Sequence, residues 1–293
     1  MTSPEPIVVT SAVLRDWPLP PPGPNKDAGR ALIVGGSCQN PGAVILAAEA
    51  ALRSGAGKLQ IATVTDVAAQ VATVLPEALV RGLPSRPDGD LAAEAAEGIL
   101  ELADGCSSVL LGPGLLGADA AATLLEAVLP HLDATVVIDA LAMAYITERP
   151  DGVTHLDGRV ILTPNLSELA HTLQVDSSEV EDEPAGCALR LARSAQAVVV
   201  CGGEQTWVAA PEGQVWRLDC GGRGLAVSGS GDVKAGIILG LCARGASPAQ
   251  AATWGAHLHG SAGERLAASV GRFGFLAREL PSQVPAILAE TEA

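Results

Sequence analysis

The chain alternates between short apolar runs and longer stretches with helical periodicity. Residues 31–34 and 135–138 are apolar at nearly every position, a pattern typical of strands buried on both faces of a sheet. Longer stretches such as residues 118–131 repeat their apolar side chains every three or four positions, as an amphipathic helix does. This alternation predicts an α/β fold with a mostly parallel central sheet and helices on both of its faces.

The expected elements cover most of the chain. Strands are predicted at residues 30–34, 58–63, 108–111, 135–138, 160–162 and 197–200, with an antiparallel hairpin of 206–209 and 214–218 at the sheet edge. Helices are predicted at residues 41–53, 91–103, 118–131, 165–173, 185–194, 248–268 and 276–289, and directly after residue 231. Residues 1–29 are Pro-rich and are expected to form an extended arm outside the core, and residues 30–293 a single domain.

A glycine-rich stretch, residues 224–231, runs directly into one of these helices. Gly229 and Gly231 allow a tight turn and a close approach to a ligand. The free amides and the dipole of the helix N-terminus favour an anion such as phosphate. Asp232 lies in the first turn, where it can cap the helix or face a ligand as a base. A glycine-rich turn with an ordinary Asp cap is the alternative.

The same helix carries two further glycines, Gly236 and Gly240, one turn apart. Glycines at this spacing leave a stripe without side chains, so we expect the helix to pack closely against a neighbour.

Small residues and carboxylates follow five of the predicted strands. Ligands of open α/β sheets bind outside the carboxyl ends of the strands, so these positions indicate a site. Asp139 could instead be a turn residue, and Glu168 fits a capping box with Asn165. The five strand ends carry residues 35–37, residues 112–114, Asp139, Asn165 with Glu168, and residues 202–203.

Charge and cysteine usage limit the possible functions. The formal net charge of −15 argues against binding of nucleic acid or of anionic membranes. With only three lysines, Lys26, Lys58 and Lys234, a phosphate site built on several lysines is excluded. The six cysteines form no Cys-x-x-Cys pair, and no signal peptide or membrane span is evident, so we expect reduced thiols in a cytoplasmic protein.

Seven segments, taken in order, resemble the ADP- or ATP-dependent NAD(P)H-hydrate dehydratases, a branch of the ribokinase-like superfamily. The resemblance extends over roughly residues 25–290, nearly the whole chain. It implies a ribokinase-like three-layer α/β/α sandwich, a homotetramer, and a separate hydrate epimerase as a working partner. The segments are residues 25–37, 41–43 with 50–57, 112–114, 139–141, 163–164, 224–236 and 259–263.

The resemblance also implies a reaction. Members of this family use a nucleotide (ADP in the bacterial members) and Mg²⁺ to phosphorylate the hydroxyl of a hydrated nicotinamide ring. Loss of phosphate with a ring proton then restores NADH or NADPH.

The family's site positions carry over to this chain residue by residue. By resemblance, Asp232 engages the hydrated ring as the base for its hydroxyl, and Ala43, Gly114 and Asn165 fall on hydrated-cofactor positions. The nucleotide positions correspond to Cys201, Gly202, Gly203, Glu204, Gln205, Ser230 and Gly231.

Two positions depart from the family pattern. Asn165 stands where the family usually has His, and Cys201 where it usually has Lys, so a cation is missing at the nucleotide strand end. Cys201 could border the phosphates or could point into the core, leaving residues 202–205 to contact the nucleotide through their backbone. Asn165 and Glu168 also match the Asn-x-x-Glu of superfamily kinases, which makes Glu168 a candidate ligand of Mg²⁺.

Two other functions therefore stay open. One is an ATP-dependent small-molecule kinase with Asp232 as base, and the other is a nucleotide-binding protein without catalysis. Residues 42–43, 50–57 and 259–263 favour the dehydratase, because they resemble the dehydratases and not the vitamin kinases.

Overall fold

The computed structural model describes residues 5–21 and 23–293. Ten strands form one sheet in the order β1-β10-β9-β8-β7-β6-β5-β2-β3-β4, and only β9 runs antiparallel to its neighbours. The predicted mostly parallel sheet is thus confirmed. The strands are β1 Ile7–Val8, β2 Arg30–Val34, β3 Lys58–Val64, β4 Ala78–Leu83, β5 Ser108–Leu111, β6 Thr135–Ile138, β7 Val160–Leu162, β8 Val198–Gly202, β9 Thr206–Ala209 and β10 Val215–Leu218.

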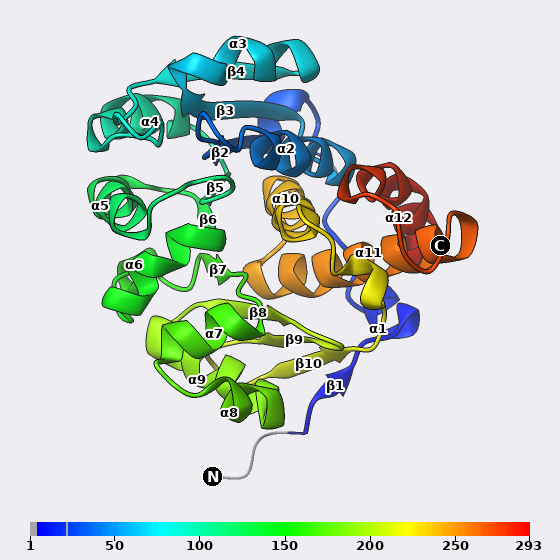
Figure 1. The fold of residues 1–293 in the computed structure, drawn as a ribbon. Helices are drawn as coiled ribbons and strands as arrows, with labels where there is room; N and C mark the ends of the chain where they lie inside the picture. The colour runs from blue at the N-terminus through cyan, green and yellow to red at the C-terminus, as the bar shows by residue number, and fades with distance from the viewer. Residues whose placement is uncertain (1–4, 22) are drawn as a thin grey trace.

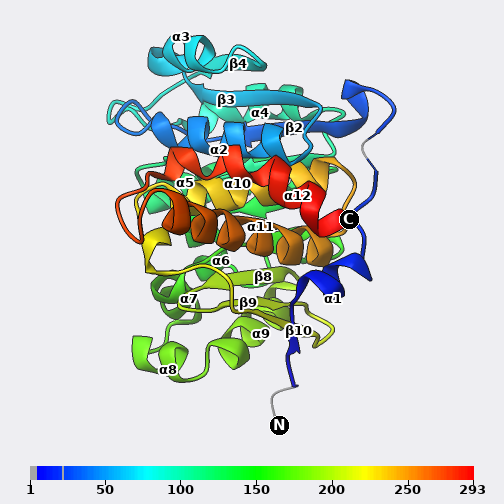
Figure 2. The same cartoon turned by 90° about the vertical axis from the view of Figure 1, so that its right-hand side faces the viewer.

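Helices cover both faces of the sheet (Figure 1). The first face carries α2 (Gly42–Ser54), α10 (Ser230–Ala243), α11 (Pro248–Ser269) and α12 (Val284–Glu292), which lie in front of the sheet in Figure 2. The second face carries α4 (Ala96–Ala103), α5 (Ala118–Val128), α6 (Met143–Glu148), α7 (Leu166–Leu173), α8 (Ser177–Asp182) and α9 (Pro184–Ala195).

Each face of the sheet has its own apolar core. Successive residues of β2 alternate between the two cores: Ile33 belongs to the first, and Leu32 and Val34 to the second. All three are 1% exposed or less. Burial on both faces explains why the parallel strands appear in the sequence as continuous apolar runs.

Some elements after β3 were not predicted from the sequence. They include α3 (Thr65–Val74), which lies over β4 in Figure 1, and β4 itself, as well as the short helices α6 and α8. β4 is an edge strand whose side chains are only partly covered, and it includes the exposed Leu79 and Arg81 with a glycine at position 82. It therefore lacks the continuous apolar run by which the other strands were found. The last helix begins later than expected, because residues 277–283 form 3₁₀ turns.

The N-terminal segment is not an extended arm outside the core, as the prolines had suggested. It contains β1, which pairs with β10, and a short helix α1 (Ser11–Arg15). Leu14 is fully buried, and the ring of Trp17 stacks on that of Trp216 at 5.6 Å. Trp254 Nε1 donates to the Trp17 carbonyl oxygen at 2.9 Å. The β9–β10 hairpin is therefore not the sheet edge, because β1 covers it.

Helix α10 is the most closely packed helix and is buried nearly all round. A Cβ on Gly236 would overlap the carbonyl oxygen of Ala47 in α2, and one on Gly240 would overlap that of Ala51. On the sheet side, Ser108 Oγ in β5 donates to the Leu239 carbonyl at 3.2 Å. The predicted close approach is confirmed, and it holds α10 between α2 and the sheet.

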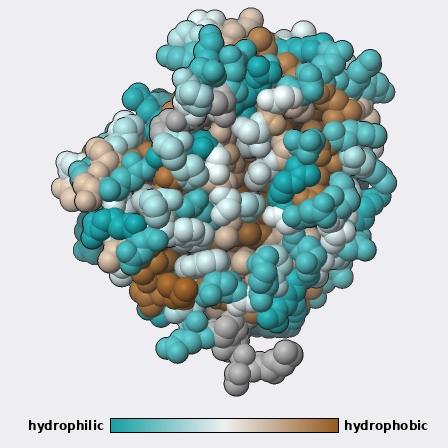
Figure 3. Space-filling view, turned by 180° about the vertical axis from the view of Figure 1, so that it is seen from behind, coloured by the Kyte–Doolittle hydropathy of each residue, from teal (hydrophilic) through white to brown (hydrophobic). Residues whose placement is uncertain are grey.

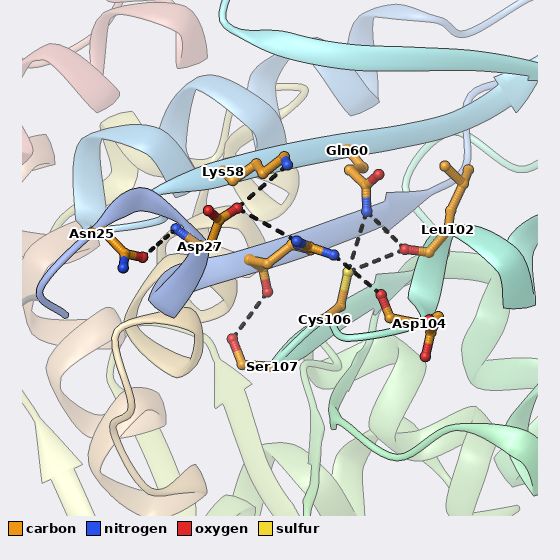
Figure 4. Close-up of polar contacts among 9 residues, drawn as sticks. Asn25, Asp27, Lys58, Gln60, Leu102, Asp104, Cys106 and Ser107 are labelled. Atoms are coloured by element: carbon orange, nitrogen blue, oxygen red, sulfur yellow. Dashed lines mark hydrogen bonds and ion pairs between the residues drawn. The ribbon is translucent and has the colours of Figure 1, made fainter.

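A polar cluster joins the amino ends of β2 and β3 (Figure 4). Asp27 pairs with Arg30 and with Lys58, each at 3.4 Å, and Gln60 Nε2 donates to the Leu102 carbonyl at 2.7 Å. The ion pairs are partly exposed and contribute little, whereas the buried Gln60 bond satisfies a polar group inside the core. This end of the sheet is thus held by structural contacts.

Hydrophilic residues cover much of the surface seen from behind, where hydrophobic residues form separate areas (Figure 3). Within residues 5–21 and 23–293, no helix combines the length and the apolar character that crossing a membrane requires.

The contact of α10 with α2 gives a stability prediction. Gly236→Ala forces a methyl group against the backbone of α2, and overpacking of this kind should lower the free energy of unfolding by about 1–3 kcal/mol. Gly42→Ala is the control, because nothing lies within 4 Å of a Cβ there and the change should stay within about 0.5 kcal/mol. Denaturant unfolding of both variants measures the difference, and equal stabilities would contradict the close contact.

Candidate functional site

The direction in which successive strands are added to the sheet reverses between β2 and β5. The chain leaves β2 toward β3 and later leaves β5 toward β6, so this is the switch point near which ligands of open α/β sheets bind. Gly36 N donates to the Pro113 carbonyl at 2.7 Å, which ties the loops after β2 and β5 together. A Cβ on Gly114 would lie 3.0 Å from the Ala43 Cβ. Two predicted cofactor positions are therefore adjacent.

A cleft of about 600 Å³ lies at the ends of β7 and β8. Its walls are the β7 and β8 ends, the loop of residues 220–227, the first turn of α10, and His259 and Gly260 of α11. Six of the predicted site residues line it: Asn165, Gly202, Gly203, Glu204, Ser230 and Gly231.

The first turn of α10 faces the cleft through Ser230 and Gly231. Gly229 is the N-cap residue, with φ of +87°, and has no side chain to satisfy the helix amides. Nothing lies within 4 Å of a Cβ placed on Gly231. An anion can thus approach the amides of this turn directly.

Asp232 lies on a different side of the same turn. Its Oδ2 is 3.9 Å from a Cβ placed on Gly229, and that Cβ would contact Leu46 of α2. Asp232 does not line the cleft itself, so the carboxylate lies toward α2, the helix that carries Ala43. The first turn of α10 therefore separates a cleft with free amides from a region with a carboxylate.

Burial, together with the nearby charge of Asp139, raises the pKa of Asp232 to about 7. Burial also raises the pKa of Asp139, which is 5% exposed and accepts a hydrogen bond from Thr163 Oγ1 at 2.6 Å. Two like charges in a poorly solvated region resist simultaneous ionisation. A carboxylate with a pKa near neutrality can accept a proton from a substrate and release it again.

Asn165 and Glu168 form the capping box that the sequence allowed. Asn165 Oδ1 accepts from Glu168 N, and Glu168 Oε2 accepts from Asn165 N, both at 2.9 Å. Across the described part of the chain, no three His, Cys, Asp or Glu side chains gather in a way that could hold a metal ion. The Glu168 carboxylate thus has a structural role, and its binding of a metal stays a prediction.

The side chains of Cys201 and Gln205 do not reach the cleft. Cys201 is fully buried in the second core, and burial raises the pKa of its thiol to about 12. Gln205 Nε2 donates instead to Asp219 Oδ1 at 2.7 Å. Of the two orientations that the sequence left open for Cys201, the structure has the one that points into the core.

Lys234 and His259 are among the cleft residues that the sequence did not identify as site residues. Lys234 lines the cleft although only 8% of the residue is exposed, and His259 Nε2 lies 2.9 Å from Ser230 Oγ. Burial, together with the charge of Lys234, lowers the pKa of His259 to about 3, so the imidazole is neutral and orients the Ser230 hydroxyl. In the sequence Lys234 is a lone lysine within an apolar helix, and this pattern does not show where its side chain points.

The chain is similar to known proteins over nearly its whole length. The family model described as NAD(P)H-hydrate dehydratase (Carb_kinase) matches residues 31–286. The chain is 42% identical over 289 residues to the ADP-dependent (S)-NAD(P)H-hydrate dehydratase of Xanthomonas campestris pv. campestris, covering 98% of each chain.

Solved structures show the same fold. The ADP/ATP-dependent NAD(P)H-hydrate dehydratase from Bacillus subtilis, co-crystallised with ATP/Mg²⁺, superposes with a TM-score of 0.79 at 30% identity, covering 98% of this chain and 99% of that one. A ribokinase-like superfamily protein from Enterococcus faecalis gives a TM-score of 0.83 at 22% identity, covering 98% and 97%, which shows the fold alone. The ribokinase-like prediction is confirmed, and with a family model that matches nearly its whole length, the chain belongs to the NAD(P)H-hydrate dehydratase family.

Proposed function

We propose that this protein returns the (S)-hydrate of NADH or NADPH to the reduced cofactor, with ADP or ATP as the phosphoryl donor. The observation that carries the proposal is the first turn of α10, where the Gly231 amide faces a cleft and Asp232, with its raised pKa, lies outside the cleft lining. Relatives that match over nearly the whole chain bear the names of ADP-dependent dehydratases.

The two substrates occupy the two sides of this turn. The nucleotide lies in the cleft, with its phosphates on the amide of Gly231 and beside Gly202 and Gly203. The hydrated nicotinamide ring lies near Ala43 and Gly114, with Asn165 between it and the nucleotide.

The reaction then follows from this placement. Asp232 takes the proton from the ring hydroxyl while the hydroxyl oxygen forms a bond to the terminal phosphorus and the bond to the leaving nucleotide breaks. The ring C–O bond subsequently breaks, phosphate leaves with the electron pair, and the neighbouring ring carbon loses a proton. Phosphoryl transfer of this type depends on positioning and on neutralisation of charge.

Mg²⁺ is the metal we propose, bound mainly through the nucleotide. Mg²⁺ sites of this kind use one or two carboxylates together with substrate phosphates and water, which fits a described region without a cluster of three acidic or His/Cys ligands. Glu168, at the end of β7, is the candidate protein ligand. The ion would neutralise phosphate charge during transfer.

The remaining features of the proposal are a homotetramer, a separate hydrate epimerase as partner, and a cytoplasmic location. Six free cysteines are in keeping with a reducing compartment.

The proposal is tested by incubating the protein with (S)-hydrated NADH, Mg²⁺ and ADP or ATP. Recovery of the absorbance of reduced nicotinamide, with release of one inorganic phosphate per NADH, is the expected result. A stable phosphoester without recovery of absorbance would instead identify a kinase, and nucleotide binding without turnover would identify a non-catalytic protein.

Replacing the proposed base should abolish most activity. We expect Asp232→Asn to lower kcat by roughly 10²–10⁴-fold, the usual contribution of general base catalysis, with the fold intact. Asp133→Asn is the matched control, because Asp133 is exposed and pairs with Arg159 before the amino end of β6. Turnover of hydrated NADH by the Asp232 variant at the wild-type rate would remove Asp232 from the chemistry.

The raised pKa of Asp232 predicts opposite effects of pH on activity and stability. The base must be ionised, so kcat/KM should rise with pH through about 7. Between the ordinary value of 3.8 and about 7 the folded protein keeps a proton that the unfolded chain has lost, so this group's stabilisation is complete below pH 3.8 and is lost as pH rises through 7. Unfolding curves of wild type and Asp232→Asn should diverge over this range, and parallel curves would argue against the shifted pKa.

A side chain at Gly231 should block the nucleotide without disturbing the fold. The Cβ has open space, so Gly231→Val places its methyl groups between the phosphates and the amides, and we expect ADP to bind at least about tenfold more weakly, or ~1.4 kcal/mol. Gly42→Val, at an equally open position in the first turn of α2, is the control. Calorimetric titration with ADP measures both; the same affinity in the two variants would place the phosphates elsewhere.

A further inference from the structure

Lys234 is a buried cation directed into the cleft. It lies one turn after Ser230 in α10, only 8% of it is exposed, and it lines the cleft with Ser230 and Gly231. Its Nζ is 3.3 Å from a Cβ placed on Gly202, at the carboxyl end of β8. The ammonium group therefore lies between the two backbone segments to which we assign the phosphates.

This ammonium has no partner among the described residues. No hydrogen bond joins it to a protein atom, and no carboxylate lies within 4.0 Å of it, although the attraction of its charge reaches Asp139 and lowers the pKa of that carboxyl. The ammonium borders the cleft, and its positive charge has no counter-ion among the described residues. An anionic ligand that enters the cleft would supply that counter-ion.

The other charged side chains that line the cleft are less suited to bind a phosphate. Arg223 pairs with Glu204 at 3.5 Å, and their side chains are 81% and 85% exposed, so the pair is solvated and nearly neutral as a unit. Glu204 by itself would repel a phosphate. Lys234 is thus the one cation lining the cleft, within the described chain, that is both buried and unpaired.

We propose that the ammonium of Lys234 binds the phosphate chain of the nucleotide at the end of β8. The inference rests on the proposed function for the identity of the ligand as an adenine nucleotide. Cys201 of β8 is uncharged and points into the core. The cation at the carboxyl end of β8 is instead supplied by Lys234 of α10. An ammonium at 3 Å from phosphate oxygens forms charge-assisted hydrogen bonds.

The experiment compares two lysine variants by calorimetric titration with ADP and with adenosine in the presence of Mg²⁺. We expect Lys234→Met to weaken ADP binding by roughly 10- to 100-fold, the range for loss of a charge-assisted bond, and to leave adenosine binding unchanged. Lys58→Met is the matched control, because it removes the same charge at the opposite end of the sheet and should change ADP binding less than about threefold.

Thermal unfolding without ligand verifies the fold, and Lys234→Gln replaces the Met variant if that one does not fold. Unchanged ADP affinity in a folded Lys234 variant, or equal weakening of ADP and adenosine, would overturn the inference. Either result can be told apart from failure of the proposed function. That function fails if the wild type does not convert hydrated NADH to NADH. The dependence of ADP binding on Lys234 is measured without turnover.

Discussion

The contact between the backbones of α10 and α2 determines the position of every element of the site. Gly236 and Gly240 allow α10 to reach the carbonyl groups of Ala47 and Ala51, and Ser108 bonds the helix from the sheet side. A helix fixed on two sides cannot shift along its axis or rotate. Its first turn is therefore held at the carboxyl ends of the strands, where Ser230 and Gly231 line the cleft and Asp232 lies outside its lining.

Two charged residues two positions apart in α10 differ in how the packing of the helix affects them. For Asp232, burial disfavours the charged form and, with the nearby charge of Asp139, brings the pKa to about 7, which suits the base that we propose. Lys234 keeps an ammonium that borders the cleft without a counter-ion among the described residues. The first two turns of one helix thus carry both the proposed base and the proposed anion contact.

Periodicity was sufficient to predict most of the sheet, because a parallel strand buried on both faces is apolar at every position. Because such elements are apolar at every position, their sequence does not show which way each side chain points. In β8 and α10 almost every residue is buried, so no alternation could tell that Cys201 points into the core or that Lys234 points into the cleft. The N-terminal segment was misjudged for another reason: the partners of Leu14 and Trp17 lie far away in the sequence, in β10, α11 and α12.

The placement of that first segment has a consequence for synthesis of the protein on the ribosome. β1 and α1 leave the exit tunnel before the elements that cover them: β1 pairs with β10, and α1 packs against α12. Arg244 in turn binds the Pro20 carbonyl and Glu292, joining the segment after α1 to the end of α12. Domains generally fold as units during synthesis. In this protein the segment around Leu14 and Trp17 must stay uncovered until β10, α11 and α12 have also been released.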